Sequence, residues 1–185
     1  MAAPTALIEN PTAKDRPMRT SRRIRRTIVT AAALSLLAAA ASVVSATAEE
    51  IPEPSYTVAV SSAQVSLGQA VQVTVTASDI QDLYAYDLTI EFDPASFVFM
   101  PGSAESGTSG VTVDDPSPAG VRVVHTKLGT SPAASGDVVL ATVSLRAKGT
   151  GVTTVDVSSL VSVATDKATT TVADVGSAGV TVTTN

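Results

Sequence analysis

The chain has 185 residues, enough for one domain and an appendage, and hydrophobic residues make up 44% of it, which suffices for a core. It contains no cysteine, which excludes disulfides, thiolate zinc sites and cysteine nucleophiles. Seven of the twelve basic residues precede residue 27, and beyond that point 15 acidic residues face 5 basic ones. Such a surface repels phosphates and anionic lipids, so we expect neither a nucleic acid nor a membrane as partner.

Residues 18–48 have the three parts of a secretory signal peptide. A basic segment is followed by an apolar stretch over residues 28–44 and by the small-residue site Ala46-Thr47-Ala48. We therefore expect residues 1–48 to be an N-terminal extension and signal peptide, cleaved after Ala48, with Met18 as an alternative start. Arg22 and Arg23 leave twin-arginine export open. An uncleaved membrane anchor is a weaker alternative, because alanine and serine dominate the stretch and favour insertion little.

The remainder is predicted to be a linker over residues 49–55, with two prolines and three acidic residues, and one domain over residues 56–185. In that domain, short runs that alternate apolar and polar residues are separated by Gly, Pro, Asp and Ser, which is typical of an all-β sandwich. Residues 101–110, rich in Gly and Ser, are predicted to be a flexible loop. About nine strands are expected, at residues 57–60, 71–75, 83–92, 111–113, 121–126, 139–147, 153–157, 169–173 and 179–182.

The clearest of these strands is residues 83–92, LYAYDLTIEF. Successive side chains on a strand point to opposite faces, so alternate residues form two sets. One set is predicted to face the core: Tyr84, Tyr86, Leu88, Ile90 and Phe92. The other is predicted to face water: Ala85, Asp87, Thr89 and Glu91.

Several segments resemble a known family. The strand is predicted to end at Phe92-Asp93-Pro94, because proline has no backbone N–H to donate to the hydrogen bonds of a sheet. This aromatic-Asp-Pro turn resembles one that is characteristic of cohesin domains. Residues 66–68, 136–148 and 179–182 extend the resemblance over residues 56–182. It implies a nine-stranded jelly-roll β-sandwich that binds dockerin domains of polysaccharide-degrading enzymes, in a superfamily that also contains carbohydrate-binding modules.

The resemblance further implies that the exposed side of strand 83–92 binds the partner, through Ala85, Asp87, Thr89 and Glu91. In dockerin-binding cohesins this side carries Asn and Asp two residues apart. Asp87 matches the second position, whereas Ala85 occupies the first. We expect a secreted, extracellular and monomeric binding module that is not an enzyme. It needs no cofactor or metal of its own, and any calcium would belong to the partner.

Two other binding functions stay open. Direct binding of a polysaccharide would use exposed aromatic rings, which stack on sugars. There is no tryptophan, and among the six tyrosine and phenylalanine residues only Tyr56 is predicted to be free of the core and its turns. A structural or adhesive spacer domain is the second alternative.

Catalysis and metal binding have weaker support. His125 is the only histidine, and its place on a strand with Val121 and Val123 favours a structural role over a catalytic base. Asp87 and Glu91 are separated by about 13 Å at the usual rise of a strand, too far for the two carboxylates of a glycosidase. The pairs Asp79 with Asp82 and Asp114 with Asp115 lack the ligand number of a calcium loop and favour turns.

Overall fold

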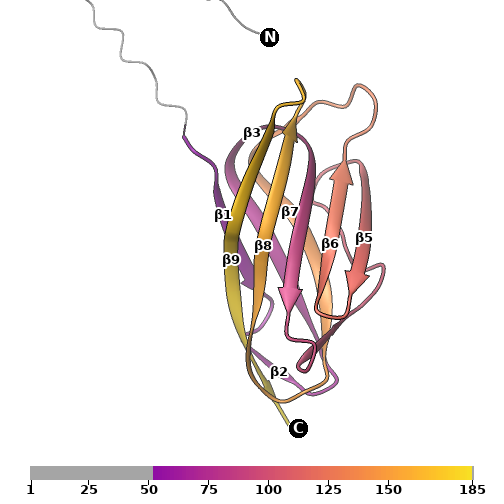
Figure 1. The fold of residues 1–185 in the computed structure, drawn as a ribbon, viewed down its shortest axis with the longest axis vertical. Helices are drawn as coiled ribbons and strands as arrows, with labels where there is room; N and C mark the ends of the chain where they lie inside the picture. Colours follow the sequence, from indigo (N-terminus) through magenta and orange to yellow (C-terminus); the bar gives the residue numbers. More distant parts are fainter. Residues whose placement is uncertain (1–51, 185) are drawn as a thin grey trace, which may run out of the picture. The chain divides into compact units, whose positions relative to one another are not determined.

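The computed structural model describes residues 52–184, which form nine β-strands (Figure 1). The predicted signal peptide and residues 49–51 of the predicted linker lie outside the described residues. None of the residues 52–184 forms a helix long and apolar enough to cross a bilayer. The strands are β1 (Ser55–Val60), β2 (Gln64–Ser66), β3 (Ala70–Phe92), β4 (Phe97–Phe99), β5 (Val111–Ser117), β6 (Gly120–Thr126), β7 (Ala134–Ala147), β8 (Gly151–Ala164) and β9 (Thr169–Thr183).

The longest strand, β3, belongs to both layers of the sandwich. Residues 70–77 pair with β1 and β7, whereas residues 83–92 lie between β8 and β6. Between these halves the chain changes direction at Asp79 and Asp82, whose φ angles of 57° and 53° lie in the left-handed region that Asp tolerates better than most residues. Figure 1 shows the strand passing from one layer to the other at this bend.

The two layers enclose a core built largely from valine and leucine. One layer contains β1, the first half of β3, β7 and β4, and the other contains β9, β8, the second half of β3, β6 and β5. Short strand β2 runs parallel to the end of β9. β-branched residues suit this position because their stiff side chains pack well on a pleated surface. The largest buried side chains are Tyr86, Phe97, Leu88, Ile90, Leu140, Leu145 and Leu160.

The all-β sandwich is confirmed, although its strands are divided differently from the prediction. Residues 71–75 and 83–92 are parts of the single strand β3, and residues 169–173 and 179–182 are parts of β9. Strands β2 and β4 were not predicted, because three residues are too few to show a period.

The predicted core side of residues 83–92 is wrong at one position. Leu83 is buried and Tyr84 is half-buried, because the pairing with β8 shifts between Leu83 and Ala85. The Tyr84 hydroxyl donates to the carbonyl oxygen of Gly129 at 2.8 Å. Tyr56, predicted to be free, instead packs half-buried against the core, and burial raises the pKa of its hydroxyl.

The segment over residues 101–110 is irregular, as predicted, but it is fastened to the edge of β7. The backbone amides of Glu105 and Gly107 donate to the carbonyl oxygens of Thr142 and Val139 at 2.9 and 3.0 Å. The composition indicates an irregular backbone, but it does not reveal that the open edge of β7 offers partners to these amides.

A substitution of Leu88 tests how much β3 contributes to stability. Leu88 is fully buried at the centre of the second half of this strand. We expect Leu88→Ala to lower the free energy of unfolding by about 2–5 kcal/mol, from lost burial and the cavity left behind. Thr89→Ala, on the opposite side of the same strand, should cost about 1 kcal/mol or less. Urea unfolding of both variants checks this, and equal losses would contradict the assignment of the two sides.

Candidate functional site

The structure gathers the four predicted binding residues on one exposed surface. Ala85, Asp87 and Thr89 are half-exposed and Glu91 is exposed, while the residues between them are buried. Strands β6 and β5 flank them on one side, and β8 flanks them on the other. We call the solvent side of β5, β6, residues 83–92 of β3, and β8 the outer face.

One end of the outer face is apolar. Opposite Ala85 and Asp87 the paired strands place valines: Val111, Val113, Val124, Val161 and Val163. Val111, Val113 and Val124 are 44%, 57% and 37% exposed. Contiguous exposed apolar side chains are uncommon on a soluble monomer and mark surfaces that bind other molecules. This patch was not predicted from the sequence, although the alternation of residues 111–113 indicates that Val111 and Val113 share one side of a strand.

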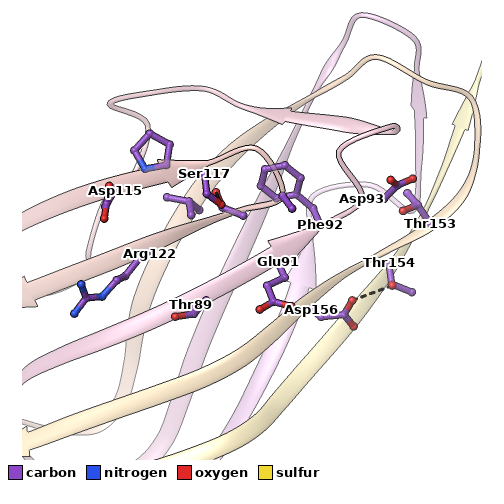
Figure 2. Close-up of a pocket in the computed structure, with 14 residues that line it drawn as sticks. Thr89, Glu91, Phe92, Asp93, Asp115, Ser117, Arg122, Thr153, Thr154 and Asp156 are labelled. Carbon is purple, nitrogen blue, oxygen red and sulfur yellow. Dashed lines mark hydrogen bonds between the residues drawn. The ribbon is translucent and has the colours of Figure 1, made fainter.

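The other end of the outer face is acidic and hollow. A groove of about 720 Å³ lies over β5, β6, β3 and β8, and Figure 2 shows the side chains around it. Its carboxylates come from four different segments: Glu91, Asp93, Asp115 and Asp156. Thr154 donates a hydrogen bond to Asp156 at 3.0 Å. The predicted residues Thr89 and Glu91 therefore line a shared groove.

A second hollow, of about 360 Å³, continues from Glu91 and Asp156 toward β9. Irregularities in two neighbouring strands create it, since the β8–β9 register shifts at Ser158 and Asp174 has a φ of 51°. The Ser158 hydroxyl donates to Glu91 at 3.0 Å, and Asp174 adds a third carboxylate. Among the described residues, no group of His, Cys, Asp and Glu side chains is placed to hold a metal ion.

An ion pair joins the two ends of the outer face. Arg122 of β6 donates from Nε to both carboxylate oxygens of Asp87, at 2.8 and 3.0 Å, and also from Nη2. The Arg122 side chain stays 55% exposed, and the hydrogen bonds and charge of Asp87 raise the pKa of Arg122. Asp87 is thus not a free carboxylate, which the sequence analysis did not foresee, because the contact runs diagonally between strands.

Two other acidic residues singled out from the sequence, Asp82 and Asp114, fasten loops to strands. One carboxylate oxygen of Asp82 accepts hydrogen bonds from the backbone amide and hydroxyl of Thr165, at 3.0 and 2.6 Å. Asp114 accepts a hydrogen bond from the backbone amide of Gly102 at 3.3 Å. These contacts agree with the turn roles expected for Asp82 and Asp114, whereas Asp115, for which a turn role was also expected, lies within β5 and lines the acidic groove.

The turn after β3 is held by Asp93, as its position before Pro94 indicates. The carboxylate accepts hydrogen bonds from the Ala95 amide at 2.8 Å and the Ser96 hydroxyl at 2.7 Å. These hydrogen bonds, that of Ser96 first, lower the pKa of Asp93. The turn thereby fixes one rim of the acidic groove.

The lone histidine lies inside the domain. His125 is 2% exposed and stacks on Tyr86, with ring centres 5.1 Å apart. The hydroxyls of Thr108 and Thr112 each lie 2.9 Å from one of its ring nitrogens. A ring enclosed in this way cannot meet an external substrate, so the structural role expected from the sequence fits its surroundings.

Residues 56–182 match the family model of the cohesin domain. The chain belongs to the cohesin family. No curated protein sequence matches the chain. Solved cohesin structures have the same jelly-roll sandwich fold. Their sequences are so different from this one that the comparison with them concerns the fold alone.

Three of these structures show the range of the comparison. A cohesin module of a family 33 glycoside hydrolase from Clostridium perfringens has a TM-score of 0.61 at 18% identity, over 71% of this chain and 98% of that one. A type I cohesin–dockerin complex from Clostridium thermocellum has a TM-score of 0.56 at 14% identity, over 70% and 99%. A non-cellulosomal cohesin from Archaeoglobus fulgidus has a TM-score of 0.56 at 13% identity, over 70% and 92%.

A substitution of Gly120 tests whether the close approach of β6 to β3 shapes the groove of this cohesin. Gly120 lies opposite Glu91, where the two strands are paired. A Cβ atom there would lie 2.6 Å from the carbonyl oxygen of Ile90. We expect Gly120→Ala to push the β5–β6 hairpin away from β3 and to lower the free energy of unfolding by about 1–3 kcal/mol. Exposed Ala119→Ser is the matched control for urea unfolding, and a loss no larger than that of the control would contradict the close approach.

Proposed function

We propose that this cohesin is a secreted, non-catalytic module that binds a dockerin-like protein domain through its outer face. The observation that carries the proposal is the pairing, on one exposed sheet, of an apolar patch with an acidic groove. Sites that bind proteins combine apolar contact with a polar and charged rim. The cohesin from Clostridium thermocellum, which shares the fold, was solved in complex with a dockerin.

The charge of the outer face indicates the chemistry of the partner. Four carboxylates line the groove, and its one basic residue, Arg122, is bound to Asp87. A partner that places Lys or Arg in the groove would gain complementary charge, which speeds association at low salt. Apolar side chains of the same partner would cover Val111, Val113 and Val124. Ala85 leaves room beside these valines for such side chains.

Secretion and the link to polysaccharide degradation are proposed on the sequence alone. Residues 18–48 carry the signal-peptide pattern, and the family resemblance associates cohesins with enzymes that degrade polysaccharides. Direct binding of a glycan by stacking has less support, because no tyrosine or phenylalanine of the described residues is fully exposed. Retention on an insoluble polysaccharide in place of a protein would revise the proposal toward a sugar-binding module.

The partner can be sought by passing culture supernatant of the producing organism over the immobilised protein, with and without calcium, and identifying retained proteins by mass spectrometry. For a retained dockerin-like domain, we expect Asp87→Ala with Glu91→Ala to weaken binding at least about tenfold, through lost charge complementarity. Thr57→Ala with Gln72→Ala, on the opposite layer, is the matched control. Unchanged affinity in the first variant, measured by calorimetry, would remove the outer face as the site.

A separate variant tests the apolar end. Val113 is 57% exposed, so Val113→Asp should fold normally, yet it places an unpaired charge in the contact. We expect the affinity for the retained domain to fall at least about tenfold, equivalent to about 1.4 kcal/mol. Val98→Asp, at a 45% exposed valine of β4, carries the same change on the other layer. Equal affinities of the two variants would show that the valine patch lies outside the contact.

A further inference from the structure

The surroundings of His125 differ from those of an ordinary core residue, because an irregular segment covers it. The ring stacks on that of Tyr86, and the backbone of Gly110 passes close to its Cε1 and Nε2 atoms. A Cβ atom on Gly110 would lie 2.8 Å from two ring atoms of His125 and 2.3 Å from the carbonyl oxygen of Thr126. The φ of Gly110 is 153°, which side chains other than glycine rarely adopt. Only glycine allows the chain to pass this close to the ring.

We call residues 106–110 the covering segment. One backbone–backbone hydrogen bond holds it, from the Gly107 amide to the Val139 carbonyl at 3.0 Å. Its other contacts involve side chains: the Thr108 hydroxyl bonds the histidine ring at 2.9 Å, the Ser109 backbone also bonds that ring, and Ser106 bonds the Tyr86 hydroxyl. Ser106 and Thr108 bond each other through their hydroxyls at 3.1 Å. Segments with few backbone hydrogen bonds open at lower free energy than the strands around them. We therefore expect opening of this segment to be the route by which water reaches the ring.

The charges around the ring do not favour its protonated form. Directly after β6, Lys127 is a buried neighbouring cation. Tyr86 faces the ring from β3, Asp114 lies on β5 with its carboxylate toward Gly102, and Glu105 precedes the covering segment. On β7, whose Leu140 carbonyl accepts the Tyr86 hydroxyl, Asp137 is exposed. Among the described residues, no carboxylate forms an ion pair with His125.

Burial, followed by the charge of Lys127, lowers the pKa of His125, and a weaker hydrogen bond with the Ser109 backbone acts in the opposite direction. The folded protein therefore binds fewer protons at this ring than the unfolded chain does. Stability from the neutral ring is fully present above the ordinary histidine pKa, and it is lost as the pH falls through the window between that value and the lowered one. Two threonine hydroxyls can accept hydrogen bonds from a protonated ring, but they supply no negative charge.

We propose that His125 and the covering segment form a proton-sensitive latch: when the ring takes up a proton, residues 106–110 open and the adjoining end of β5 loosens. Thr112, which holds the second ring nitrogen, belongs to β5 and lies between Val111 and Val113. Loosening this end displaces the apolar part of the outer face. The consequence for binding rests on the proposed function, and the latch itself does not.

The test uses the protein without any partner. Because the chain has one histidine, its ring Cε1–H signal in NMR reports this site alone. We expect it to titrate below the ordinary value of about 6.5. Backbone amide exchange, corrected for its intrinsic pH dependence, should show protection at residues 107–113 falling severalfold between pH 7.5 and 5, because the protonated ring disfavours the closed segment. Amides of Leu160 and Val172, paired between β8 and β9, serve as the internal reference.

His125→Gln is the matched variant, because its neutral amide can bond both threonine hydroxyls. Its protection at residues 107–113 should not depend on pH. If it does not fold, Thr108→Val keeps the ring but removes its bond to the covering segment. That variant should show at pH 7.5 the low protection that the native protein shows at pH 5. An ordinary histidine pKa with constant protection, or equal loss of protection in the reference amides, would overturn the latch.

Discussion

The fold depends on one constraint, which is that a single strand of 23 residues serves both layers. Strand β3 contributes hydrogen-bonded edges to β1 and β7 before its bend and to β8 and β6 after it. The buried valines of its first half and the larger buried residues of its second half meet across the core. Because each layer contains part of β3, the bend at Asp79 and Asp82 sets how the layers are joined.

The same strand determines the composition of the outer face. After the bend, β3 presents Ala85 and Asp87 toward strands rich in valine, and Thr89 and Glu91 toward Arg122, Asp115 and Asp156. The division into apolar and acidic ends therefore follows from the register of three strand pairs: β3 with β6, β3 with β8, and β5 with β6. A shift of one residue in any of them would exchange buried and exposed side chains. Core packing and surface chemistry are specified together.

The period of the sequence sufficed to predict the sandwich and the exposed placement of Asp87, Thr89 and Glu91, because alternation over ten residues has one physical meaning. It failed at Tyr84, where a register shift changes the parity, and at the joined halves of β3, because local pattern does not show how a strand continues through a bend. The contact between Arg122 and Asp87, 35 residues apart, depends on strand pairing that a single sequence does not reveal.

The pairing of β2 with β9 has a consequence for how the domain forms. Gln64 lies beside Thr181, and β2 obtains its ladder only from this last strand. Contacts between residues so distant in the chain must overcome a large loss of chain entropy, and folds rich in them form slowly. During synthesis, the segment around Val65 must wait for β9 with its backbone groups unpaired. Unpaired strand segments of this kind favour aggregation until the domain is complete.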